Sequence, residues 1–223
     1  MKNFLTALFI AALLFAFAGE ISACACCAEP GTYSIRTGKP DGYYLEILKE
    51  IKFGDTANLY LTEADFEIIK GLDEIKKDFN NESWVATAGE LGLTNSFAAK
   101  TWKFNLKTKS GKTGTLTLPM PAQMLTFKVD IHDGKTIGGG GPLLYKEFRF
   151  KGNVQSGTGF FRAGIAGPTT YFLVLQGRGN GCDNAEDFTH WHLEISGRKA
   201  EYEFYGKLNS GVSYETEEDD SQN

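Results

Sequence analysis

The fold is decided by the stretch WKFNLKTKSGKTGTLTL, which covers residues 102–118. Apolar and polar residues alternate from Trp102 to Lys107, and threonines alternate with leucines from Thr115 to Leu118. Because successive side chains of a strand point to opposite faces, this period of two predicts strands with one buried face. The intervening KSGK, residues 109–112, is typical of a turn. The stretch therefore predicts a β-hairpin.

The same period of two recurs later in the chain. Apolar and polar residues alternate from Leu125 to Ile131, and a final hairpin runs from Trp191 to Phe204 around a turn at residues 196–198. The segment YFLVL, residues 171–175, is apolar throughout, which is typical of a central strand covered on both faces. These strands predict a mainly β fold, either a single antiparallel β-sandwich or a partly closed β-barrel.

The length and composition are those of one compact domain. The chain has 223 residues, of which 42% are hydrophobic, and it contains 26 glycines but only 6 prolines. This length suits a single core, and no linker or repeat divides the sequence. We therefore expect one β-rich domain over residues 26–214.

One short helix is predicted near the N-terminus. The residues Thr62-Glu63-Ala64-Asp65 resemble a capping box, and Phe66, Ile69, Leu72 and Phe79 would share one helical face. Two weaker strand predictions precede this helix, at Tyr43–Phe53 and at Asn58–Leu61.

The first 25 residues have the pattern of a secretory signal peptide. A basic residue at Lys2 precedes an apolar run from Phe4 to Ala18, which is too short for a stable transmembrane helix. We expect an exported protein, with cleavage after Ala25. Alternatively, ISAC at residues 21–24 resembles the bacterial lipobox, a resemblance that implies lipidation of Cys24 and would be the chain's route to a membrane.

Four cysteines fall in an uneven pattern, with three near the leader and Cys182 alone. Disulfides form and persist outside the cytosol, so an exported chain is expected to pair them. We predict a Cys27–Cys182 disulfide, because Cys27 is nearest the folded body.

The charge distribution excludes one class of partner. The formal net charge is -5, and the last nine residues, 215–223, carry five carboxylates and no lysine or arginine. The rest of the mature chain is close to neutral, so it lacks the basic surface that phosphate contacts require. We expect no nucleic-acid partner, and we expect the acidic tail to be disordered.

A metal site is one alternative that the sequence raises. On a strand, His190, His192 and Glu194 would project from the same face, and His132 could join them from a neighbouring strand. Such ligands suit zinc or copper. The other interpretation is that these side chains only line a solvent-exposed face while Trp191, between the two histidines, fills the core.

A second candidate cation site lies in the glycine-rich loop that contains Cys182. Asp183, Glu186 and Asp187 offer the hard oxygen ligands that calcium prefers, although their spacing is not that of an EF-hand. The alternative is a turn rich in Asp and Asn that the disulfide holds in place.

The chain carries no serine-hydrolase elbow, no HExxH helix and no complete phosphate-binding loop. We therefore expect a non-catalytic exported β-domain that binds a small molecule, for which its aromatic residues would suit a sugar, or that sits at the cell surface. The alternative is a metal-binding protein, including a metal-dependent hydrolase, that uses the His-x-His-x-Glu face.

Overall fold

The computed structural model describes residues 26–60, 69–75, 89–131 and 141–211. The predicted signal peptide, the lipidation candidate Cys24, the metal-ligand candidate His132 and the acidic tail lie outside these residues. The described elements are β1 (Tyr33–Gly38), α2 (Gly42–Glu50), β2 (Thr56–Leu59), β3 (Glu90–Ala98), β4 (Thr101–Lys107), β5 (Thr113–Pro119), β6 (Met124–Asp130), β7 (Leu144–Asn153), β8 (Ser156–Gly159), β9 (Thr169–Gly179), the 3-10 turn η3 (Ala185–Asp187), β10 (Phe188–Gly197) and β11 (Glu201–Lys207).

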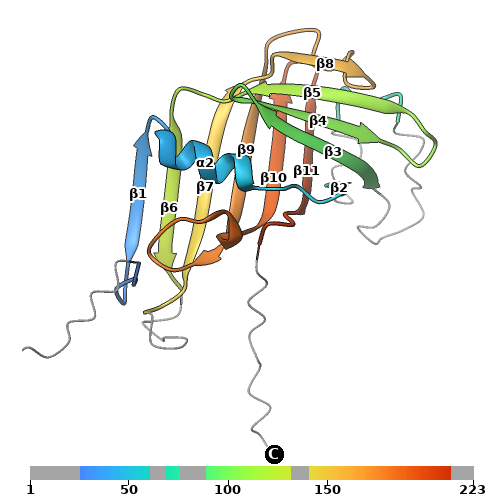
Figure 1. Ribbon diagram of the computed structural model, residues 1–223. Helices are drawn as coiled ribbons and strands as arrows, with labels where there is room; N and C mark the ends of the chain where they lie inside the picture. The colour runs from blue at the N-terminus through green and yellow to red at the C-terminus, as the bar shows by residue number, and fades with distance from the viewer. Residues whose placement is uncertain (1–25, 61–68, 76–88, 132–140, 212–223) are drawn as a thin grey trace, which may run out of the picture.

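The described strands form one antiparallel sheet of 11 strands in the order β1-β6-β7-β9-β10-β11-β2-β3-β4-β5-β8. The sheet is not closed, since β1 and β8 are its two end strands. Figure 1 shows β1, β6, β7, β9, β10 and β11 side by side, with β3, β4 and β5 arching over the side of this row that contains β9, β10 and β11. The predicted mainly β fold, a sandwich or a partly closed barrel, is confirmed.

The core lies between the arched strands and the sheet beneath them. The alternation that predicted the 102–118 hairpin places Trp102 and Phe104 in this core, and both are fully buried. The Trp102 ring packs 4.9 Å from that of Phe150 on β7, and the Phe104 ring packs 5.6 Å from that of Trp191 on β10. We call the core-facing side of β6, β7, β9, β10 and β11 the inner face and the opposite side the outer face.

The strand predicted at Tyr43–Phe53 is wrong, because this segment contains the helix α2. Its N-cap is Asp41, whose side chain accepts a hydrogen bond from the Tyr44 N–H at 3.2 Å. Ile47 and Leu48 are buried, and the Tyr44 ring packs 5.6 Å from that of Phe148 on β7. A spacing of three and four residues between apolar side chains is the period of a helix, not of a strand.

The helix predicted from Thr62 onward does not extend through residues 69–75, and the rest of it lies outside the described residues. Lys70 instead forms an antiparallel bridge with Glu201, and Gly71 has a φ of +86°. A positive φ is left-handed backbone that interrupts a helix. The apolar pattern still marked core residues, because Ile69 and Leu72 are buried.

The disulfide joins Cys182 to Cys26, not to the predicted Cys27. The Cα atoms of Cys26 and Cys182 are 4.9 Å apart, and the Gly181 N–H donates to the Cys26 carbonyl at 2.7 Å. This hydrogen bond brings the Cys26 backbone alongside the loop that contains Cys182, so Cys26 is the residue placed within disulfide distance. Among the described residues, α2 and η3 are far too short to cross a membrane. Both findings are compatible with an exported protein.

Candidate binding groove on the outer sheet face

The outer face of the sheet carries rows of side chains that the strand register brings level. Arg149 on β7 pairs with Val174 on β9, Val174 pairs with His192 on β10, and His192 pairs with Tyr205 on β11. Paired residues of neighbouring strands share a face and lie about 4.5–5.5 Å apart at their Cβ atoms. A cation, an apolar group, an imidazole and a phenol are therefore neighbours across four strands.

Two further rows flank this one. On one side are Glu147, Gln176, His190 and Lys207; on the other are Lys151, Phe172, Glu194 and Glu203. The side chains of the three rows range from exposed, as His190 is, to buried, as Val174 and Glu147 are.

These rows surround a groove of about 570 Å³, which we call the outer groove. Phe172 and Val174 give it apolar surface, supplied by the strand whose apolar run predicted a position covered on both faces. That strand is central, as predicted, but Phe172 is only half-buried and opens into the groove. The lining residues are Tyr60, Glu147, Arg149, Phe172, Val174, Gln176, His190, Trp191, His192, Glu203, Tyr205 and Gly206.

The charged groups of the outer groove are oriented by one another. His192 Nε2 lies 2.9 Å from Glu203 Oε2, and the Arg149 guanidinium pairs with the Glu147 carboxylate. The Tyr145 hydroxyl donates to Glu147 Oε1 at 2.5 Å. These contacts hold polar groups at set positions around an apolar floor, as ligand sites require.

The tyrosines in and beside the groove offer an uncharged hydroxyl for hydrogen bonding and aromatic rings for stacking. Burial, and then the hydrogen bond to Glu147, raise the pKa of Tyr145 well above its usual value, so its hydroxyl stays protonated. The rings of Tyr60 and Tyr205 lie 6.3 Å apart in an edge-to-face arrangement. Because Tyr60 is 48% exposed, its ring offers surface to a ligand.

Of the predicted metal ligands, His190 and His192 line this groove, Glu194 lies in the row beside it, and His132 is outside the described residues. The core-filling role of Trp191 is confirmed, since it is 1% exposed, while His190 and His192 both line the groove. The other contacts of the histidines are non-metal partners: His190 Nδ1 lies 2.9 Å from the Thr189 hydroxyl, and His192 contacts Glu203. The described residues contain no group of three His, Cys, Asp or Glu side chains placed to hold a metal ion. Zinc or copper binding stays a prediction.

The predicted calcium ligands are only partly brought together. Asp183 and Asp187 are buried side by side on the inner face, whereas Glu186 is exposed. Lys128 lies 2.9 Å from Asp183, and Lys146 lies 2.7 Å from Asp187. The two carboxylates thus already have cationic partners, which does not favour calcium, and calcium binding stays a prediction.

Sequence reasoning identified the histidines but missed Arg149, Glu147, Glu203 and both groove tyrosines. These residues come from separate strands, and the order of strands in the sheet brings them together. The available signal was the apolar run at residues 171–175, because a strand that is apolar on both faces leaves apolar surface on its outer face when only its inner face packs in the core. Comparison with known protein families, curated proteins and solved structures finds no match to this chain.

Proposed function

We propose that the protein is an exported, non-catalytic domain that binds an uncharged sugar in the outer groove. The observation that carries the proposal is the groove itself, with an apolar floor, one exposed and one half-buried tyrosine ring, and charged groups paired with one another in its lining. A volume of about 570 Å³ lies within the range of small-molecule sites.

The chemistry of a sugar matches both kinds of surface in the groove. One face of a pyranose presents C–H groups that pack on aromatic rings, as Tyr60 and Tyr205 offer. Its hydroxyls both donate and accept, and they suit the carboxylate of Glu203 and the guanidinium of Arg149. The lining of the groove carries the carboxylates of Glu147 and Glu203 and the guanidinium of Arg149, a balance that disfavours an anionic ligand.

Binding is favoured over catalysis by the way the titratable groups are used. Glu147 is paired with Arg149 of the same strand, and Glu203 is paired with His192 of the neighbouring strand, so both of these carboxylates already have a partner. The groove lies on an open sheet face, where water would not be excluded from a reaction centre.

The test is a glycan array of neutral and acidic saccharides, probed with the mature protein and with three variants. We expect wild type to bind neutral glycans, and Tyr205→Ala and Arg149→Ala each to lose most of that binding. Tyr33→Ala is the matched control, because Tyr33 is a more exposed tyrosine, at 67%, on β1 outside the groove. Absence of glycan binding by wild type, or undiminished binding by Tyr205→Ala, would contradict the proposal.

Export is tested separately, at the N-terminus of the protein purified from its native cells. We expect a chain that lacks the first 25 residues and begins at Cys26. An N-terminal Cys24 that carries acyl groups would support the lipoprotein alternative, and an intact Met1 would contradict export by this leader.

A further inference from the structure

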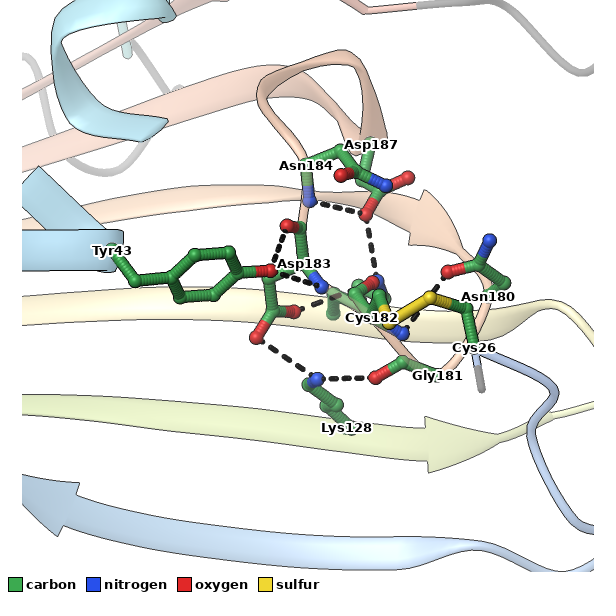
Figure 2. The surroundings of a disulfide bond; sticks show 10 residues. Cys26, Tyr43, Lys128, Asn180, Gly181, Cys182, Asp183, Asn184 and Asp187 are labelled. Carbon is green, nitrogen blue, oxygen red and sulfur yellow. Dashed lines mark hydrogen bonds and ion pairs between the residues drawn. A yellow bond between two sulfur atoms is a disulfide. The ribbon is translucent and has the colours of Figure 1, made fainter. Parts of the chain in front are cut away.

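Next to the disulfide, the inner face of the sheet holds a buried cluster of two lysines and two aspartates. Lys128 comes from β6, and Asp183 and Asp187 come from the segment between β9 and β10 (Figure 2). Lys146 belongs to β7. The side chains of Lys146, Asp183 and Asp187 are 1%, 4% and 7% exposed. The two positive and two negative formal charges of this cluster balance. Burying them nevertheless costs desolvation free energy.

Lys146 is held against both carboxylates at once. Its Nζ lies 2.7 Å from Asp187 Oδ2 and 3.4 Å from Asp183 Oδ1, and it also donates to the Cys182 carbonyl. Asp187 is fixed in turn by the Asn184 N–H, which donates to Oδ2 at 3.0 Å. The geometry therefore holds one amine and one carboxylate together on two separate elements.

Only one of the two carboxylate oxygens of Asp183 has a hydrogen-bonding partner. Its Oδ2 pairs with Lys128 Nζ at 2.9 Å, while its buried Oδ1 accepts no hydrogen bond. A buried acceptor without a donor is uncommon and calls for an explanation. This oxygen faces Lys146 at ion-pair distance, so it is placed to take a proton from the ammonium.

We propose that Lys146 and Asp187 condense into an intramolecular isopeptide bond. The Lys146 ammonium passes one proton to Asp183 Oδ1, and the neutral amine nitrogen attacks the carboxyl carbon of Asp187. The bond from that carbon to one oxygen breaks, and the oxygen leaves as water with two of the three ammonium protons. The third proton stays on the new amide nitrogen, Asp183 returns to its carboxylate form, and no oxidant or reductant takes part.

Two physical effects favour the condensation at this place. Groups held in reacting geometry behave as though present at about 10⁵–10⁸ M, which offsets the unfavourable equilibrium of amide formation in water. The reaction also removes one buried positive and one buried negative charge, and with them their desolvation cost. Lys128 and Asp183 remain as a matched pair, so the cluster stays neutral.

The bond would join β7 covalently to the segment that the Cys26–Cys182 disulfide ties to the N-terminal residues. Two cross-links would then hold the β9–β10 loop, one sensitive to reductant and one not. This role requires no metal and does not depend on the sugar proposal.

The test is mass spectrometry of the mature protein after reduction, alkylation and denaturation. We expect wild type to be lighter than its sequence by one water, and Lys146→Arg, which keeps the charge but cannot form this amide, to have its full mass. Lys128→Arg is the matched control and is expected to keep the deficit. After trypsin digestion, the wild-type peptides 136–149 and 179–198 are expected to travel as one cross-linked species, with fragmentation placing the bond between Lys146 and Asp187.

The wild-type digest decides the proposal even if a variant fails to fold. Separate, unmodified peptides 136–146 and 179–198 would overturn it, because trypsin cleaves after Lys146 only when its amine is free, and the cluster would then be an ion-pair network. A deficit of one water without the cross-linked species would also overturn it, since dehydration of another aspartate would then be its source.

Discussion

Trp191 and His190 are adjacent in sequence and face opposite sides of the sheet. The Trp191 ring packs 5.5 Å from that of Phe53 and 5.6 Å from that of Phe104, whereas His190 is exposed on the outer face. Trp191→Ala should lower the free energy of unfolding by about 3–5 kcal/mol, the usual cost of emptying an aromatic core site. His190→Ala should lower it by under about 1 kcal/mol.

Urea unfolding of the two variants measures both values. A Trp191→Ala variant as stable as wild type would mean that β10 does not present this face to the core. The same measurement with and without a chelator addresses the predicted metal site. Wild type destabilised by the chelator, and insensitive to it once His190 is replaced, would support a bound metal.

Substitution of two glycines that both have a positive φ can distinguish the stability cost of backbone strain from the cost of steric crowding. Gly111 has a φ of +90° with open space around it, while a Cβ on Gly71, at +86°, would lie 2.6 Å from the Lys199 carbonyl oxygen. Gly111→Ala should cost about 1–2 kcal/mol from backbone strain alone. Gly71→Ala should cost clearly more, because backbone atoms would have to move. Equal losses in thermal unfolding would contradict the close packing at Gly71.

At the scale of elements, the disulfide is expected to stabilise the fold by restricting the unfolded chain. It spans a sequence separation of 156 residues, and the chain-entropy relation gives about 5 kcal/mol as an upper bound for such a loop. Cys26→Ser and Cys182→Ser should each lower stability by a similar amount, and the double variant should lose no more than either single one.

The comparison with Cys27 tests which cysteine is the partner. Denaturant unfolding of the Cys27→Ser and Cys182→Ser variants, alone and combined, should show additive losses. Non-additive losses for that pair, with additive losses for Cys26 and Cys182, would restore the Cys27–Cys182 pairing predicted from the sequence.

Local pattern predicted some elements well and others poorly, for physical reasons. The 102–118 hairpin has one solvent-facing side and one buried side, so polar and apolar residues alternate along both strands and the pattern predicts both. The segment at residues 42–50 contains aromatic residues that suit strands, but the Asp41 cap and the burial of Ile47 and Leu48 favour a helix. Pairing of Cys26 in place of Cys27 depends on the backbone contact with Gly181, which lies far away in sequence.

The strand β6 shows how tertiary context overrides an apolar pattern. Its alternation is present, but Leu125, Phe127 and Val129 lie on the outer face and are only half-buried. The inner positions after Met124 are polar: Thr126 is buried, and Lys128 reaches the Asp183 carboxylate. A period of two predicts a strand but not which face is the inner one.

At the scale of the whole molecule, one open sheet creates two distinct surfaces from the same strands. On its inner face β7 supplies Lys146 to the buried charged cluster, and on its outer face it supplies Arg149 to the outer groove. Neither grouping is visible in the sequence, because each combines residues of separate strands. The order β7-β9-β10-β11 is what assembles the outer groove.

The most direct test of the central proposal is an NMR titration of isotope-labelled mature protein with the methyl glycosides of glucose, galactose and mannose. We predict that at least one glycoside shifts amide signals clustered around Val174, His192 and Tyr205, and that Tyr205→Ala abolishes these shifts while Tyr33→Ala retains them. Shifts confined to β1 and β6, or no saturable shift with any of the three glycosides, would contradict sugar binding in the outer groove.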